Sequence, residues 1–207
     1  RWAKGSFQTI IKLLPPLLRS RASGFKKAQA LLHRSGYLVH PLMLILSVLA
    51  LPILTITVRI KPPPFVLAVL ALPLVLSVLA PSTLYAAGQF VAYRDGWRRL
   101  LWMPMLVVVG VGLAVSNTRA ILEALFGRPS EFVRTPKRGD REIKAYRVKL
   151  PWVAFLELLL GVYCLYTLSV YVQAGRLLVG PFLAIYAAGF LLIGVLTLLQ
   201  SLGRVGY

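Results

Sequence analysis

Four long apolar runs limit what this chain can fold into more than any other feature of its sequence. They cover residues 37–58, 65–87, 151–173 and 177–202. Because a helix rises about 1.5 Å per residue, each run is long enough to cross a hydrocarbon layer about 30 Å thick. The runs predict an all-α membrane protein with four transmembrane helices in two hairpins, at 37–87 and 151–207.

The composition excludes a soluble globular domain. Of the 207 residues, 58% are hydrophobic and 14% are charged, whereas a soluble domain carries about 25% charged residues. The single cysteine excludes an intramolecular disulfide, and two histidines with one thiol cannot build a structural zinc site. The net charge of +18 favours anionic lipid as a partner and argues against nucleic acid, given so apolar a chain.

Two amphipathic stretches precede the first apolar run. Within residues 6–18 apolar side chains recur at helical spacing, and residues 25–34 repeat the pattern. We expect residues 1–36 to form helices in the cytosolic membrane interface, with Pro15-Pro16 breaking or kinking the first. The alternative is that they are surface helices of a soluble domain absent from this sequence.

Residues 100–115 are also apolar enough to cross the membrane. The distribution of Lys and Arg residues indicates whether they do. If they cross, the 24 Lys and Arg residues divide 12 to 12 between the two sides; if they do not, 21 lie on one side and 3 on the other. Basic residues accumulate on the cytosolic side of membrane proteins. The sequence therefore predicts that residues 88–126 form a cytosolic interfacial or re-entrant segment and that both ends of the chain are cytosolic.

A basic loop is expected over residues 127–150. Residues 119–149 hold nine Lys or Arg against four Asp or Glu, and Gly127, Pro129, Pro136 and Gly139 interrupt helix formation. On charge alone, the loop suits anionic lipid or a nucleotide diphosphate.

Two short motifs resemble a known enzyme family. Arg1-Trp2 resembles the end of the Q-x-x-R-W signature of membrane-integrated family 2 glycosyltransferases, the group that includes cellulose and mannan synthases. The string Phe132-Val133-Arg134-Thr135-Pro136-Lys137 resembles the F-x-V-T-x-K gating-loop motif of cellulose synthases, with Arg134 in place of valine. The two motifs occur in the family's order around a pair of spans.

The resemblance implies roles for five residues. Arg1 and Trp2 would bind the acceptor, since an indole stacks on the apolar face of a sugar and a guanidinium pairs with diphosphate. Phe132, Thr135 and Lys137 would form a gating loop that contacts the nucleotide. In the family the catalytic residues lie upstream of the Arg-Trp pair, so no catalytic residue and no metal ligand are expected in this chain.

The resemblance also implies an activity for a longer protein. The chain would be a fragment of a larger enzyme in the cytoplasmic (plasma) membrane, which transfers sugar from a nucleotide-sugar donor to a growing β-linked glycan or a lipid acceptor. A missing N-terminal catalytic domain would hold the divalent metal, Mg or Mn, and this fragment alone would be inactive. The alternative is a small non-enzymatic membrane protein, either a transporter subunit or a lipid-binding scaffold.

Other polar residues in the last two spans are weaker candidates. Glu157 stands six residues into the third run, where we expect hydration or pairing with a loop arginine. Aromatic side chains suit a polysaccharide passage but more often serve packing or interfacial belts, and four tyrosines fall in this class: Tyr163, Tyr166, Tyr171 and Tyr186.

Overall fold

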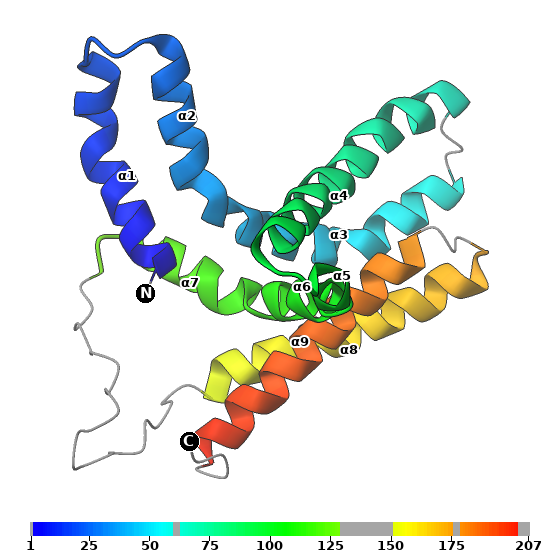
Figure 1. Ribbon diagram of the computed structural model, residues 1–207. Helices are drawn as coiled ribbons and strands as arrows, with labels where there is room; N and C mark the ends of the chain where they lie inside the picture. Colours follow the sequence, from blue (N-terminus) through cyan, green and yellow to red (C-terminus); the bar gives the residue numbers. More distant parts are fainter. Residues whose placement is uncertain (1, 60–62, 129–150, 176–178, 203–207) are drawn as a thin grey trace.

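The computed structural model describes residues 2–59, 63–128, 151–175 and 179–202, and every regular element within these ranges is a helix. The predicted all-α class is thereby confirmed. In chain order the elements are α1 (Trp2–Arg19), α2 (Gly24–Arg34), the 3-10 turn η1 (Ser35–Leu38), α3 (Val39–Arg59), α4 (Pro64–Ala92), α5 (Gly96–Leu100), α6 (Met103–Gly112), α7 (Ala114–Leu125), α8 (Pro151–Gln173) and α9 (Gly180–Ser201). Figure 1 shows their arrangement.

Several helices are long and apolar enough to cross a membrane. Within the described residues, three stretches meet this condition, namely Gly24–Thr57, Trp152–Gln173 and Gly180–Ser201. A fourth arises if Gly96–Gly112, which includes α5 and α6, and α7 count as one broken span or re-entrant segment; the two parts are bent by 43° relative to each other. The predicted run 65–87 lies in α4, a helix of 29 residues, several of whose side chains are outside the described part of the chain. The all-α membrane class therefore stands, while the number of four spans stays a prediction.

Glycines allow the last two helices and α6 to approach one another closely. In Figure 1, α8 and α9 lie side by side as a hairpin, and α6 contacts α9. A Cβ atom added at Gly161 would lie 2.6 Å from Leu191 Cγ, and one at Gly189 would lie 2.5 Å from the Val108 carbonyl oxygen. Small residues at such positions bring helices near enough for extensive van der Waals contact, which drives helix association in lipid. The main buried cluster forms here: Val111, Ala114, Val115, Val153, Cys164, Ala187 and Phe190.

Tyrosines attach α3 to α8. The Tyr163 hydroxyl donates a hydrogen bond to the Val48 carbonyl at 2.6 Å, and the Tyr171 hydroxyl donates to the Ala50 carbonyl at 2.9 Å. Pro52 lies inside α3 and has no N–H group. It therefore cannot donate the usual helical hydrogen bond to the Val48 carbonyl, four residues earlier. Tyr163 therefore replaces the missing helical bond, and these two tyrosines serve helix packing.

The first helix forms an arm with α2 and begins against α7 (Figure 1). Ala3 and Phe7 of α1 are buried with Ile121 and Ala124 of α7. Of the expected break or kink at Pro15-Pro16, the break is wrong, because α1 continues through both prolines to Arg19. The carbonyls that lose their bonds belong to Ile11 and Lys12, whose residues are exposed, so solvent can satisfy them.

Candidate functional site

Only part of the predicted site lies in the described part of the chain. Trp2 is the first residue of α1, and 84% of its surface is exposed. Arg1, Phe132, Thr135 and Lys137 lie outside the described residues, so the structure does not test their predicted positions. The described residues that flank the basic loop belong to the end of α7 and the start of α8.

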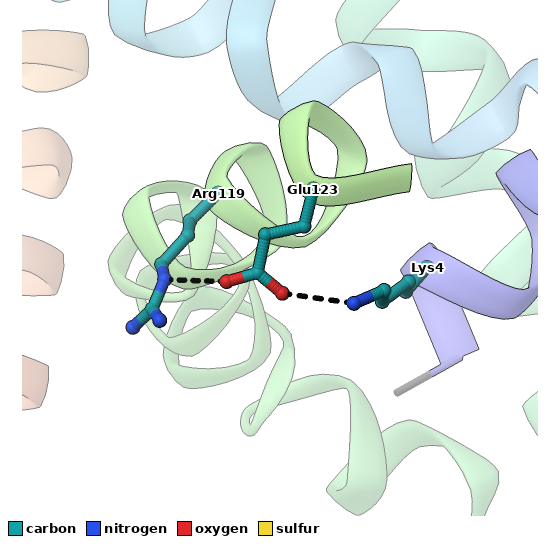
Figure 2. Close-up of polar contacts among 3 residues, drawn as sticks. All are labelled: Lys4, Arg119 and Glu123. Atoms are coloured by element: carbon teal, nitrogen blue, oxygen red, sulfur yellow. Dashed lines mark hydrogen bonds and ion pairs between the residues drawn. The ribbon is translucent and has the colours of Figure 1, made fainter. Parts of the chain in front are cut away.

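Three charged residues join the start of α1 to α7. Lys4 Nζ lies 3.1 Å from Glu123 Oε2, and Arg119 Nε lies 2.8 Å from Glu123 Oε1, so each carboxylate oxygen accepts from a different cation (Figure 2). The Lys4 side chain is only 8% exposed. Hydrogen bonds between ionised partners are roughly twice as strong as neutral ones. This triad (Lys4, Glu123 and Arg119) fixes α1 on α7 at one end of both helices.

The charges around Glu123 determine its ionisation. Burial acts to raise the pKa of this carboxyl, but the hydrogen bond from Lys4 and the charges of Arg119 and Lys4 outweigh burial, so the pKa lies below its ordinary value of 4.5. Glu123 is near the C-terminal end of α7, outside the three stretches that qualify as membrane spans by themselves. It is therefore ionised at neutral pH and is neutralised by its two partners.

A glycine cap ends α7 just before the basic loop. Gly127 has a φ of +63°. Its N–H donates to the Ala124 carbonyl at 3.2 Å, and the Arg128 N–H donates to the Glu123 carbonyl at 2.9 Å. These two bonds define a Schellman motif, which satisfies the last carbonyls of a helix. The motif holds the backbone of Arg128 close to the triad.

A cavity of about 630 Å³ lies between α3, α7 and α8. Its polar lining comes from Thr118, Arg119, Glu123 and Arg128, and Trp152 forms an aromatic wall. The Arg119 guanidinium carbon lies 5.2 Å from the centroid of the Trp152 ring, within the range of a cation–π contact. The rest of the lining is apolar: Leu44, Val115, Leu122, Phe126 and Leu156. The cavity thus combines positive charge with apolar surface.

A polar contact joins α3 and α7 at the residue that precedes Thr118. The Asn117 side-chain nitrogen lies 2.9 Å from His40 Nε2, and Tyr37 stacks on the His40 ring with 6.1 Å between centroids. Thr118, the next residue, lines the cavity. Its hydroxyl oxygen is buried and has no hydrogen-bond partner among the described residues. Because this oxygen is buried, Thr118 lines the cavity through its other atoms.

Glu157 belongs to a different place in the structure. It is 1% exposed, and its Oε2 accepts a hydrogen bond from the Thr197 hydroxyl of α9 at 3.3 Å. The expectation that water hydrates this carboxyl is wrong, because the α8–α9 contact covers it. The expected loop arginines other than Arg128 lie outside the described residues.

The triad was not identified from the sequence. Arg119 and Glu123 are four residues apart, and this spacing is the one signal in the sequence for their ion pair on one helix face. Lys4 is 119 residues from Glu123 along the chain, and no pattern in the sequence indicates that they meet. Trp152 was also not identified from the sequence, although it stands in the first turn of a predicted span, a position typical of interfacial tryptophan.

The predicted Mg or Mn ion is expected in a preceding domain, so this structure does not test it. Among the described residues there is no group of three or more His, Cys, Asp or Glu side chains able to hold a metal ion.

Comparison with known proteins finds no matching family model, no similar curated protein and no similar solved structure.

Proposed function

We propose that this chain is the membrane part of a family 2 glycosyltransferase, which transfers sugar from a nucleotide-sugar donor to a growing β-linked glycan. In this proposal it supplies the acceptor platform, the gating loop and the translocation passage. One observation carries the proposal beyond the motifs themselves. The first turn of α1, directly after Arg1-Trp2, is attached to α7, which leads into the loop that contains Phe132, Thr135 and Lys137.

The short connections make this attachment informative. Lys4 is two residues after Trp2, and its bond to Glu123 at 3.1 Å joins α1 to α7. Glu123 is five residues before Arg128, where the described part of α7 and its cap end. Trp2 thus begins a helix that packs against α7, and the second motif follows α7 in sequence, which supports an acceptor site next to a gate.

Each motif residue has a chemical role in the proposed reaction. Trp2 would stack on the apolar face of the acceptor sugar, leaving the sugar hydroxyls free for hydrogen bonds. Lys137 would neutralise negative charge on the leaving nucleotide, the Thr135 hydroxyl would donate to a phosphate oxygen, and Phe132 would pack on the base or sugar. The reacting carboxylates and the metal would belong to the preceding catalytic domain.

The proposal includes a placement in the cytoplasmic membrane. The chain would cross four times, with α1, α2 and α5–α7 along the cytosolic face. Trp97 and Trp102 are exposed, and the Arg98 guanidinium lies 5.3 Å from the Trp97 ring centroid. Aromatic and basic residues of this kind gather at the membrane boundary, which supports an interfacial position for α5.

Substitutions in the complete enzyme test the proposal. Trp2→Ala and Thr135→Ala should each reduce sugar transfer to a few per cent or less while the protein still inserts in the membrane. Trp97→Ala is the matched control, because Trp97 is also exposed but belongs to α5; it should retain activity. The readout is incorporation of labelled sugar by membranes containing equal amounts of each protein.

The same measurement separates the two function classes. If Trp2→Ala and Thr135→Ala retain full activity, or if the full gene product transfers no sugar, the glycosyltransferase assignment is wrong and a non-enzymatic membrane protein is favoured. Sugar transfer by the 207 residues alone would contradict the separate prediction that this fragment is inactive.

A further inference from the structure

The cavity between α3, α7 and α8 has the two surfaces that an amphiphilic anion needs. Its lining includes the basic residues Arg119 and Arg128, and it also includes leucine side chains of α3 and α8, Leu44 and Leu156. A small soluble anion would contact only the basic residues. A phosphate attached to acyl chains would contact both the basic and the apolar residues.

The positive charge of the cavity is only partly neutralised within the described residues. Glu123 is the single carboxylate in the lining, and Lys4 already shares it. Arg119 binds Glu123 through Nε, and Figure 2 shows its two terminal nitrogens pointing away from that carboxylate. Arg128 forms no ion pair with any described residue. Two guanidinium groups therefore keep donors for an anion, and guanidinium groups bind phosphate well.

The cavity also lies where a lipid headgroup would be. Trp152 stands at the start of the apolar stretch of α8, and Leu156 follows one turn later. Tryptophan is enriched at the boundary between hydrocarbon and water. Leu44 belongs to the apolar stretch that includes α3. The charged part of the cavity is thus at the polar end of the spans, and its apolar part continues toward the hydrocarbon.

We propose that this cavity binds the headgroup phosphate of an anionic membrane phospholipid. Arg119 and Arg128 hold the phosphate, and the acyl chains leave along Leu44 and Leu156. Basic pockets between membrane helices are known to bind anionic headgroups. The bound lipid would join α3, α7 and α8 at the base of the loop. This inference concerns lipid binding and is independent of the proposed sugar transfer.

Binding of single phospholipids to the full chain in detergent tests the proposal. Native mass spectrometry would compare phosphatidylglycerol with zwitterionic phosphatidylcholine of the same acyl chains. We expect phosphatidylglycerol to bind more tightly, and Arg128→Gln to weaken it about tenfold, the effect of one charged hydrogen bond. Arg98→Gln removes the same charge from α5 and should change the affinity less than twofold.

A second variant covers the possibility that charge loss alone alters the result. Arg128→Lys keeps the net charge but loses the planar, bidentate donors of the guanidinium group, and should weaken phosphatidylglycerol about threefold while the helical circular dichroism is unchanged. Equal binding of the two lipids, or equal losses in Arg128→Gln and Arg98→Gln, would overturn the proposal. Displacement of the lipid by millimolar inorganic phosphate or by a nucleoside diphosphate would also overturn it, because the ligand would then be a soluble phosphate.

Discussion

Two helix contacts in this molecule are stabilised by different interactions, one by close apolar packing and the other by ion pairs. Where α6 meets α9, glycines bring the backbones together, and the surrounding core is apolar. Where α1 meets α7, a buried lysine and an arginine share one carboxylate beside a small apolar cluster. The first contact depends on shape, so pH and salt should hardly affect it. The second depends on charge, so the arm can be released without disturbing the hairpin.

The largest effect should come from adding one methyl group at the shape-dependent contact. In Gly112→Ala the new Cβ would collide with Ile193 Cγ1 and the Gly189 carbonyl oxygen. Since backbone cannot yield as a side chain does, α6 and α9 must separate, at a cost of about 3 kcal/mol of unfolding free energy. Thermal unfolding in detergent measures this. Gly110→Ala is the control on the same helix, because open space surrounds its Cβ position; equal losses in both variants would refute the close-contact explanation.

The second largest effect should come from a substitution at the charge-dependent contact between α1 and α7. Glu123→Gln keeps the shape of the side chain but leaves Lys4 buried without its counter-charge. Removing one partner of a buried pair is costly, and for this partly exposed pair we expect about 2 kcal/mol. Faster hydrogen exchange in α1, with α8 and α9 unchanged, would report it. Asp95→Asn breaks the exposed pair with Arg99 and should cost less than about 0.5 kcal/mol.

Acid should reproduce the effect of Glu123→Gln. The pKa of Glu123 is lower in the folded protein than its ordinary value of 4.5, so the unfolded state binds the proton more readily. The contribution of the triad is therefore complete above pH 4.5 and is lost as the pH falls toward and through the folded-state pKa. Exchange protection of α1 between pH 7 and pH 3 would show this loss in the unmodified protein. The same loss in Glu123→Gln would contradict the assignment to this carboxyl.

A smaller effect is expected where a tyrosine completes α3. Tyr163→Phe leaves the Val48 carbonyl without its donor, which should cost about 1.5 kcal/mol in an apolar environment. In a Pro52→Ala background the helix regains its own N–H donor, so the same substitution should cost much less. Unfolding of the four proteins in this double-mutant cycle gives the coupling energy. Tyr166→Phe, an exposed tyrosine of the same helix, should have little effect, and strict additivity in the cycle would exclude the replacement role of Tyr163.

The smallest effect concerns the cap of α7. Gly127→Ala forces a side chain into the left-handed region although the space around it is open, which costs about 1 kcal/mol. The change should loosen Arg128 without releasing α1, as hydrogen exchange would show. Gly88→Ala in α4, also in open space but with no positive φ, should be neutral or slightly stabilising.

The apolar pattern predicted the helices well and their ends less well. The run 151–173 coincides with α8, because an abrupt change from charged to apolar residues marks its start. Periodicity also predicted α1 and α2. The break expected at Pro15-Pro16 does not occur, and the carbonyls that lose their helical bonds there belong to exposed residues.

The candidate site was much less predictable. The motif residues Phe132, Thr135 and Lys137 were chosen by resemblance and lie outside the described residues. The triad and the cavity depend on contacts between α1, α3, α7 and α8, segments separated by up to 150 residues in sequence. Hydropathy and charge counts average over such contacts, so they indicated a basic face but not its arrangement.

The hydrogen bond from Tyr163 to Val48 has a consequence for biosynthesis. The ribosome delivers Val48 115 residues before Tyr163, so α3 must enter the lipid with one carbonyl lacking its helical donor. Because an unpaired carbonyl is costly in hydrocarbon, we expect α3 to stay near the translocation machinery, or to bind a water molecule, until α8 is inserted. Because of the proline, the hydrogen bonding of α3 is complete only after α8 has been synthesised. The unpaired carbonyl also favours α8 as the packing partner over a hydrophobic helix that has no hydroxyl group at that depth.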